Sequence, residues 1–436
     1  MSNDTVIRIR GARLIDPYQG LEAPDADIRI LNGRVLASQE GQQYPEEVID
    51  ARGLWVVPRL IDMHVHFREP GQTWKENIET GSQAAAHGGI TAVAAMPNTS
   101  PVIDSPELVE WEAKRARDLG LVRLYPVGAI TVGSEGQELA DLYRMQAAGA
   151  RAFSDDGQPV MSSQMMRAAL SYSTTLRTPI INHAEDKSLS RGASVHEGRP
   201  AARLGLAGVP ETAESAMVWR DVLLAALTGG RLHVAHVSAM DSIDALAWAQ
   251  HRHLSVTAEA TPHHLLLTDE ALTAWGYNPV TKVNPPLRPE ASRQALVTAV
   301  QKGLIGVLAS DHAPHHQDDK ARPYPDAPFG ISGLETILGG LVTALIQPGL
   351  MTPMNALKLL TTGPDGVLGL GCQGLAPGQP ADLTLIDPGH VWTVDPDCFY
   401  SMGRNTPLQG MALTGQARAA MVNGRWVMRE GEVLSS

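Results

Sequence analysis

The chain repeats one unit eight times, and this repeat constrains its fold more than any other feature. In each unit a short apolar run ends in polar residues, and in most units a stretch of helical composition follows. The runs are WVVPRLIDMHVH, ITAVAAMPN, VRLYPVGAI, ARAFSDD, TPIINHAE, RLHVAHVS, LSVTAEATPHH and LIGVLASDHAP. Eight such units predict an α/β fold with a closed (β/α)8 barrel of the TIM type over residues 58–371. The competing open, doubly wound sheet lacks a glycine-rich nucleotide motif after its first strand.

Both ends of the chain have a residue pattern that differs from the eight repeated units. The segments DTVIRIRGARLIDP and ADIRILNGRVLA alternate apolar and polar residues and turn at Asn32-Gly33. The segments ADLTLIDPG and ARAAMVNGRWVMREGEVL follow the same strand, Asn-Gly turn, strand pattern. We therefore predict one small β-sandwich domain built from residues 1–57 and 372–436, with the barrel inserted between its two parts.

Composition and charge exclude several classes of partner. The chain has 436 residues, 43% of them hydrophobic, and its net charge of -12 opposes general binding to nucleic acid. No apolar run approaches the roughly 20 residues that a membrane helix needs. The two cysteines, Cys372 and Cys398, have no metal-ligand spacing, and the first residues, MSNDTVIRIRG, lack a signal-peptide core. We expect a cytoplasmic protein that acts on a small molecule, without nucleic-acid or membrane partners.

The first run ends in two histidines, in the segment LIDMHVHFREPG. Side chains alternate along a strand, so His64 and His66 point to one side and can share a cation. From this segment alone, a metal site and a pair of ordinary strand-end histidines are equally open. The C-terminal ends of the eight runs together carry His64, His66, Asn98, Asp156, His183, His236, His263, His264 and Asp311. A barrel gathers its strand ends in one place, so this set predicts a site with the ligands that zinc accepts.

The motifs in these runs resemble a known family. DMHVHFREPG, GGITAVAAMPNTSP, FSDDGQPV, INHAED, HVAHVSA, EATPHH, KVNPPLR and ASDHAPH resemble the motif series of the amidohydrolase superfamily. Within it they are most similar to the bacterial dihydroorotases of the class I type, over almost the whole chain. HFREPG and MPNT discriminate best, because other cyclic amidases and many deaminases also carry the paired histidines.

The resemblance implies a set of metal ligands and a cofactor of one or two zinc ions per subunit. His64, His66 and Asp311 would hold one metal, and His183 and His236 would hold the other. Asp156 would bridge the two metals, with Asp155 in a supporting role. Many relatives use a carboxylated lysine as the bridge, and the shorter aspartate predicts a weaker bridge or a less occupied second site.

The resemblance also implies a reaction and the residues that bind the substrate. The reaction is the reversible closure of N-carbamoyl-L-aspartate to L-dihydroorotate in pyrimidine biosynthesis, with a metal-activated hydroxide and Asp311 as general acid and base. Arg68 would hold the substrate carboxylate with a planar fork of donors. Asn98 and His315 are the other donors implied for that carboxylate, and Asn284 and the backbone of Phe329 and Gly330 would read the amide edge of the ring.

Some alternatives remain open at this point. A hydantoinase or allantoinase would share the metals, although Arg68 and Asn98 together favour dihydroorotase. A non-catalytic relative that associates with aspartate transcarbamoylase would have lost ligands, and here every ligand position is filled. We expect a homo-oligomer, and association with that transcarbamoylase stays open.

Six other histidines and Arg59 lie outside the predicted ligand set. We predict structural roles for His87, His233, His251 and His253, and either a supporting or a packing role for His263 and His264 at a strand end. Arg59 stands where the family usually has glycine, and we expect a slight local shift there.

Overall fold

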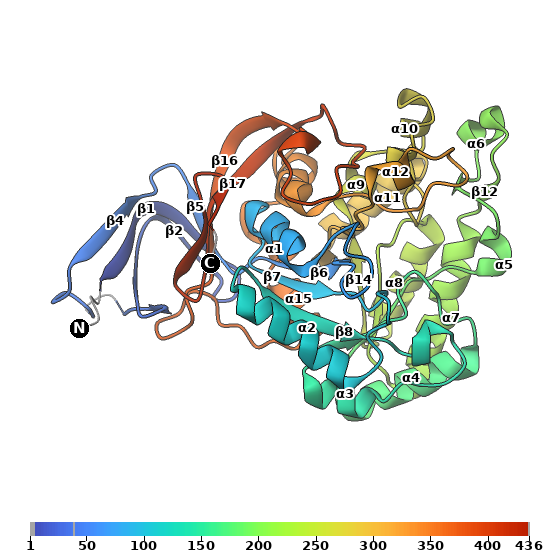
Figure 1. Ribbon diagram of the computed structural model, residues 1–436, viewed down its shortest axis with the longest axis horizontal. Helices are drawn as coiled ribbons and strands as arrows, with labels where there is room; N and C mark the ends of the chain where they lie inside the picture. The colour runs from blue at the N-terminus through green and yellow to red at the C-terminus, as the bar shows by residue number, and fades with distance from the viewer. Residues whose placement is uncertain (1–4, 38–39, 435–436) are drawn as a thin grey trace.

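A computed structural model of the protein describes residues 5–37 and 40–434, and eight parallel strands form its centre (Figure 1). Each strand pairs with the next one around the barrel, and a parallel bridge between Val65 and His312 joins the last strand to the first. The backbone N–H of His66 donates to the carbonyl of His312 at 2.8 Å across this closure. The strands are β6 (Ile61–Val65), β7 (Ala92–Ala95), β8 (Arg123–Gly128), β9 (Ala152–Phe153), β10 (Ile180–Asn182), β13 (Leu232–Val234), β14 (Val256–Ala260) and β15 (Val307–Leu308). The predicted barrel is confirmed.

Helices surround the barrel, and local sequence sets several of their ends. For α2, Ser105 caps the first turn, Pro106 fits the first helical position, and Gly120 ends the helix in the left-handed conformation. The outer helices are α1 (Ile78–His87), α2 (Pro106–Leu119), α3 (Leu142–Ala148), α4 (Ser163–Leu176), α7 (Thr212–Thr228), α8 (Met240–His251), α11 (Glu290–Gln301), α13 (Ile337–Leu341), α14 (Pro353–Lys358) and α15 (Thr362–Leu368), with a π-helix at Val342–Ile346. No helix in the described ranges is long and apolar enough to span a membrane.

Short elements decorate the loops that leave the strands. They are α5 (Lys187–Ser190), β11 (Val195–His196), α6 (Arg199–Leu204), β12 (Gly208–Val209), α9 (Pro262–Leu266), α10 (Ala271–Ala274) and α12 (Gln317–Lys320). Single 3-10 turns lie at Val132–Ser134, Pro279–Thr281, Leu334–Thr336 and Pro396–Cys398. Several of these elements follow β10, β14 and β15, so they extend the same end of the barrel at which the strands finish.

The two ends of the chain build a second sheet. Figure 1 shows the blue N-terminal strands beside the red β16 and β17. Its strands are β1 (Val6–Asp16), β2 (Leu21–Leu31), β3 (Arg34–Val35), β4 (Glu46–Asp50), β5 (Trp55–Pro58), β16 (Leu383–Thr393), β17 (Ala412–Val422), β18 (Arg425–Arg429) and β19 (Glu432–Val433). They form one nine-stranded sheet in which β5 pairs antiparallel with β16. The predicted small β domain from both termini is confirmed. Its exact boundaries stay a prediction, and residues 1–4, 38–39 and 435–436 lie outside the described residues.

Two Asn-Gly hairpins meet inside this sheet. Asn32 and Gly33 have φ angles of 50° and 76°, and Asn423 and Gly424 have 51° and 74°. Positive φ at both central residues is typical of the type I′ turn, which matches the twist of hairpin strands. A Cβ on Gly33 would lie 2.5 Å from the carbonyl oxygen of Asn423. Glycine is therefore required at position 33 for close backbone approach as well as for the turn.

The run WVVPRLIDMHVH is not one strand, as the sequence analysis assumed. It divides into β5 in the small sheet and β6 in the barrel, because Pro58 cannot donate a ladder hydrogen bond and Arg59 turns aside. Arg59 Nε donates to Asp382 at 2.8 Å, and Nη1 lies 3.0 Å from Tyr125 Oη and 2.9 Å from Cys372 Sγ. The side chain that replaces the usual glycine thus links the barrel to the small domain.

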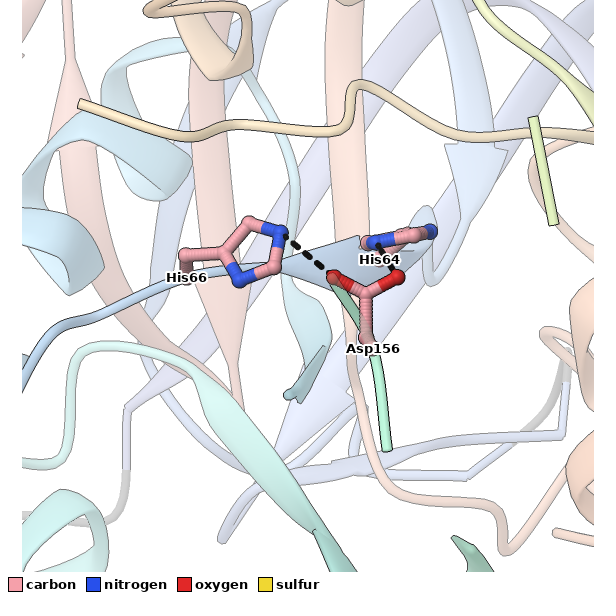
Figure 2. Close-up of side chains that lie close together, drawn as sticks. All are labelled: His64, His66 and Asp156. Carbon is pink, nitrogen blue, oxygen red and sulfur yellow. Dashed lines mark ion pairs between the residues drawn. The ribbon is translucent and has the colours of Figure 1, made fainter. Parts of the chain in front are cut away.

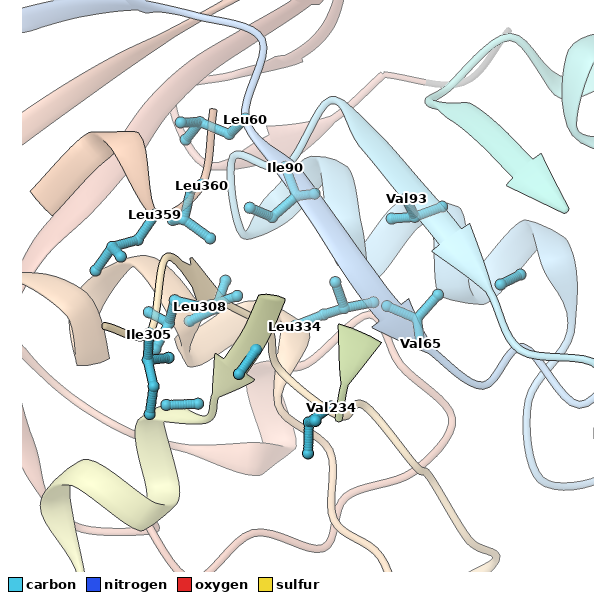
Figure 3. Packing of buried hydrophobic residues seen from close by; sticks show 14 of the residues in the cluster. Leu60, Val65, Ile90, Val93, Val234, Ile305, Leu308, Leu334, Leu359 and Leu360 are labelled. Atoms are coloured by element: carbon cyan, nitrogen blue, oxygen red, sulfur yellow. The ribbon is translucent and has the colours of Figure 1, made fainter. Parts of the chain in front are cut away.

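The barrel is closed by apolar packing. Leu60, Val65, Ile90, Val93 and Leu308 are among the buried residues that Figure 3 shows around the first and last strands. Burial of side chains of this kind contributes roughly 1.5 to 3 kcal/mol each. The polar site described below therefore stands on a rigid apolar base.

Candidate metal centre and substrate site

Six predicted ligands come together at the C-terminal ends of the barrel strands. His64 lies in β6 and His66 follows that strand directly. The other four, Asp156, His183, His236 and Asp311, come one to three residues after β9, β10, β13 and β15. All six side chains are buried. The strand-end rule of the barrel has placed residues far apart in sequence within one centre.

Asp156 lies between the two histidines of the first motif (Figure 2). Its Oδ1 is 3.4 Å from His64 Nε2, and its Oδ2 is 3.5 Å from His66 Nε2. Asp311 Oδ1 approaches the same two nitrogens, at 3.6 Å from His64 and 3.2 Å from His66. These are the atoms that would surround one metal ion.

A second group lies on the other side of Asp156. His183 Nδ1 and His236 Nε2 are 2.9 Å apart, and each is 3.8 Å from Asp156 Oδ1. Asp156 therefore belongs to both groups, which is the position a bridging carboxylate would take. In each group the possible ligand atoms all lie within 4.8 Å of one another.

The donor set fits divalent metal. Two imidazoles and a carboxylate per group, with Asp311 beside the first, are ligands that zinc accepts. His64 Nε2 and Asp156 Oδ1 are buried, face this centre and have no hydrogen-bond partner within the described protein. Buried polar atoms rarely stay unsatisfied, so a cation at this place would account for both.

The electrostatics of the centre also favour a cation. Burial opposes protonation of His64, but Glu259 and Asp156 outweigh it and raise the His64 pKa well above the usual value. Burial likewise opposes ionisation of Asp156 and Asp311, yet the surrounding histidines hold the pKa of both carboxyls well below their usual range. The centre therefore holds two ionised carboxylates that call for positive charge.

Three residues of the site have left-handed backbone. Arg68, His236 and Asp311 have φ angles of 61°, 33° and 49°. This conformation costs roughly 1 to 3 kcal/mol for a residue other than glycine and persists only where the surroundings enforce it. Arg68 is a predicted substrate residue, His236 a predicted ligand, and Asp311 a predicted ligand and proton carrier. Such strain at all three marks a site in which side-chain direction matters.

Glu259 supports the centre, and the sequence analysis did not identify it. Its Oε1 is 2.5 Å from His64 Nδ1, and its Oε2 is 3.1 Å from His233 Nε2. A carboxylate on Nδ1 fixes the tautomer that leaves Nε2 free for a metal. Glu259 is fully buried in β14, two residues after Thr257 and on the same face of the strand, and both side chains bond to His233. A lone charged residue in the apolar run LSVTAEATPHH was the signal that could have found it.

His233, predicted to be structural, lies buried in this same network and bonds to Thr257 Oγ1 at 2.8 Å.

Glu185 plays a corresponding part for the second group. Its Oε2 lies 3.0 Å from His183 Nε2 and accepts from Lys187 at 2.6 Å and from Asn284 Nδ2 at 2.9 Å. His183 thereby keeps Nδ1 toward the centre. Asn284, predicted to read the substrate ring, has its Nδ2 committed to Glu185 and 3.1 Å from His183, so contact with the ring falls to its amide oxygen.

Asn98 and the paired histidines His263 and His264 occupy defined positions near the centre. Asn98 Oδ1 accepts from His66 Nδ1 at 2.8 Å, and its Nδ2 points to the carbonyl of Asp156 at 3.5 Å. His263 and His264 follow the end of β14 by three and four residues, within the helix α9 that Thr261 caps. His264 bonds to Thr261 Oγ1 at 2.7 Å and to the carbonyl of Pro285 at 3.0 Å.

Arg68 lies inside the site, not on the surface. Its Nε donates to the carbonyl of Pro314 at 3.3 Å, and Nη2 is 3.5 Å from His315 Nε2. Burial lowers its pKa to about 10, an effect that Asp311 and Asp156 oppose. Within the described residues it forms no ion pair with Glu69, whose Oε2 instead accepts from the backbone N–H of Ile78.

His315, Phe329 and Gly330 form the far wall beside Arg68. His315 Nε2 donates to the carbonyl of Phe329 at 2.7 Å, and Gly330 N donates to the carbonyl of Lys282 at 2.9 Å. Burial and the charge of Arg68 lower the His315 pKa to about 2, so its ring is neutral. A neutral ring that donates from Nε2 has only an acceptor at Nδ1. As placed here, His315 suits a substrate N–H better than the carboxylate predicted for it.

A parallel barrel with this histidine and aspartate centre at its strand ends defines a metal-binding cyclic amidohydrolase. A family model described as dihydro-orotase-like matches residues 53–242. The chain is 47% identical to a dihydroorotase from Pelotomaculum thermopropionicum over 97% of this chain and 98% of that protein. It is 45% identical to one from Anaeromyxobacter dehalogenans over 98% of both. Likeness at this level over the full length shows that the chain belongs to the dihydroorotase family.

Solved structures agree on the fold. The L-hydantoinase (dihydropyrimidinase) from Arthrobacter aurescens matches with a TM-score of 0.87 and 27% identity, over 99% of this chain and 97% of that one. A dihydropyrimidinase from Brevibacillus agri matches with a TM-score of 0.84 at 21% identity. Cyclic amidohydrolases of different substrates thus share the scaffold, and the substrate must be argued from the residues around the centre.

Proposed function

We propose that this chain is a dihydroorotase of the bacterial class I type, which interconverts N-carbamoyl-L-aspartate and L-dihydroorotate. The observation that carries the proposal is the buried guanidinium of Arg68 directly beside the metal-compatible centre. A cyclic imide without a carboxylate would leave this charge unpaired, and an unpaired buried charge is costly. Both proposed substrates carry a carboxylate that would neutralise it.

The proposed ligands follow the two groups described above. His64, His66 and Asp311 would hold one zinc ion, His183 and His236 would hold a second, and Asp156 would bridge them. When bound, divalent metal lowers the pKa of a water molecule toward neutrality and polarises the carbonyl under attack. Glu259 and Glu185 keep the correct nitrogens of His64 and His183 directed inward.

Asp311 is the proposed proton carrier. It accepts the proton of the attacking water during ring opening and returns it to the ring nitrogen as the amide bond breaks. In ring closure the same carboxylate acts in reverse order. Carbamoyl aspartate carries one more carboxylate than dihydroorotate, so closure consumes a proton and low pH favours the ring.

The substrate would lie between the centre and the wall formed by His315 and Phe329. Arg68 offers a planar fork to the carboxylate, and Asn98 Nδ2 adds a donor. His315 Nδ1 and the amide oxygen of Asn284 face the remaining N–H groups. The roles proposed for the backbone of Phe329 and Gly330 require a shift, because both groups already have protein partners.

The proposed function extends to the assembly and the location of the protein. We propose a homo-oligomer, in the cytoplasm, whose association with aspartate transcarbamoylase is tested by co-purification of the two chains.

The decisive experiment combines metal analysis with assays on three substrates. Purified protein should hold one to two equivalents of divalent metal per chain, predominantly zinc, and lose turnover when a chelator removes it. Dihydroorotate should be turned over, and hydantoin and allantoin should not. Full turnover by metal-free protein would contradict the metal proposal, and preference for hydantoin or allantoin would contradict the substrate.

A further inference from the structure

Two buried lysines lie beside the substrate wall, and neither forms an ion pair with a carboxylate of a described residue. Lys320, at the end of α12, has its side chain almost fully buried. Its Nζ donates to the carbonyls of Gly330 at 2.9 Å, Pro328 at 3.0 Å and Lys282 at 3.5 Å. An ammonium has three N–H donors, and three carbonyl oxygens surround this one.

Lys282 mirrors this arrangement from the other side of the same segment. Its Nζ donates to the carbonyls of Tyr324 at 2.9 Å and Pro325 at 2.8 Å. The same ammonium lies 4.6 Å from the centre of the Phe329 ring, within the range of a cation-π contact. Together the two lysines contact the middle and the C-terminal end of residues 321–330 through the backbone.

Burying charge in this way is unfavourable, and the pKa of Lys320 shows it. Burial and the nearby Lys282 ammonium lower that pKa to about 7. A methionine would fill the same volume without the desolvation cost. The fold keeps two lysines here although apolar side chains would pack at lower cost, which points to a task for their N–H donors.

The segment that they hold is the one that contacts the substrate residues. The carbonyl of Phe329 accepts from His315 Nε2, and the carbonyl of Gly330 accepts from Asn405 Nδ2 at 2.9 Å. Asn405 Oδ1 in turn accepts from the backbone N–H of His315 at 3.3 Å. Any movement of residues 328–330 would therefore displace His315, and with it the surroundings of Arg68.

We propose that Lys282 and Lys320 are positioning residues that hold residues 321–330 over the substrate side of the site through backbone carbonyls. The role rests on the proposed function, because Arg68 and His315 are substrate residues only in that function. The Lys282 ammonium also adds to the charge of Arg68 in an otherwise acidic protein, and this favours an anionic substrate at this wall. Binding, rather than the chemical step, depends on the two lysines.

The test replaces Lys320 with methionine, which keeps the length and removes the donors. Lys320→Met should raise the KM for dihydroorotate roughly ten- to a hundredfold, the range for lost hydrogen bonds to a charged group. Its kcat should change less than about threefold, and its metal content should not change, because the ligands lie on other elements. Lys114→Met, on the exposed face of α2 with Asp118 as partner, is the matched control and should match the wild type.

Hydrogen exchange of peptides covering residues 321–330 gives a readout that needs no turnover. The amide of Gly330 should exchange faster in Lys320→Met, while peptides from β6 and β13 keep their protection. Lys282→Met serves as a second variant and should show the same local loss.

An unchanged KM with unchanged exchange would overturn the proposal. So would loss of metal or of protection throughout the chain in both variants, since the lysines would then be general structural residues. A wild type without dihydroorotate turnover would refute the proposed function alone, and exchange would still decide the anchoring role.

Discussion

The two halves of the site are organised in different ways. Around the metal centre, side chains hold one another: Glu259 binds His64, Glu185 binds His183, and Asn98 binds His66. Around Arg68, side chains hold backbone: Arg68 donates to Pro314, and Lys320 donates to Gly330. The first half has a surplus of carboxylates, and the second has cations without carboxylate partners.

This difference indicates where precision is needed. Ligands on strand ends inherit the rigidity of the barrel, and a side-chain partner behind His64, His66 and His183 fixes the ring orientation, which is the remaining freedom. The substrate wall is a loop that is bridged to the barrel end only next to Gly330, at Ile331, among the described residues, and the two lysines bond to its carbonyls directly. Substitutions in the first half should affect metal and turnover, and those in the second should affect substrate affinity.

The largest effect is expected from Asp311→Asn, which belongs to the metal half and to the chemistry. Asparagine keeps an oxygen that can coordinate, but it cannot accept and return a proton at neutral pH. Turnover should fall by a factor on the order of 10² to 10⁴ in both directions, with much of the metal retained. Steady-state rates and metal analysis on the same sample check this, with the exposed Asp318→Asn as control. Near-normal turnover with bound metal would show that another group carries the proton, and His264 or His315 would be tested next.

Arg68→Lys tests the substrate half. Lysine preserves the charge but cannot present a planar fork, so the KM for dihydroorotate should rise roughly ten- to a hundredfold. Metal content should stay at the wild-type level. Arg322→Lys, in the exposed part of the same loop, is the matched control. Unchanged kinetics in Arg68→Lys would remove Arg68 from the substrate site.

Glu259→Gln tests whether the carboxylate that bonds to His64 Nδ1 contributes to metal affinity. The substitution removes the charge that fixes Nδ1–H on His64 while keeping the shape, so metal affinity should fall about tenfold. Competition with a chromogenic chelator measures the dissociation constant, and Glu110→Gln on the exposed face of α2 serves as control. If the dissociation constant is unchanged but the KM rises, the proposed division between the halves is wrong.

Asn98 contacts the metal half through His66 and Asp156, and its proposed contact with the substrate carboxylate would link it to the other half, so it gives the smallest expected effect on metal. Asn98→Asp keeps an acceptor for His66 Nδ1 but replaces the donor with a negative charge, which repels the substrate carboxylate. The KM should rise by about tenfold while metal content is unchanged. Asn98→Ala removes both groups and should lose metal affinity as well. Equal behaviour of the two variants would show that Asn98 serves the centre alone.

The sequence was sufficient for the barrel and for the placement of the six predicted ligands. The repeat fixes the fold, and the fold brings strand ends together, so each ligand could be read one strand at a time. The strand-end rule does not identify the carboxylate that bonds to His64. Glu259 lies 195 positions away, and its contact depends on register in the closed barrel. Pairing across the barrel has no periodic signal in the chain.

Loops and junctions were the hardest parts to predict. The apolar run through Val57 and Leu60 has one uniform pattern, yet it serves two sheets, and only the pairing of β5 with β16 reveals the division. Thr261 caps the helix α9 directly after β14, so His263 and His264 lie on a helical turn that the strand pattern does not predict. The lysines around residues 321–330 bond to carbonyls, and backbone positions in a loop cannot be derived from side-chain patterns.

The pairing of β5 with β16 has a consequence for how the protein is made. Val56 lies opposite Leu385, roughly 330 positions later in the chain, and ribosomes add about 5 to 20 residues per second. For roughly 15 to 65 seconds the newly made β5 waits with an unpaired edge that favours association with other strands. The barrel is synthesised during that interval, and only the last part of the chain to emerge covers the edge. The nascent protein therefore carries this uncovered strand edge throughout the synthesis of its catalytic barrel.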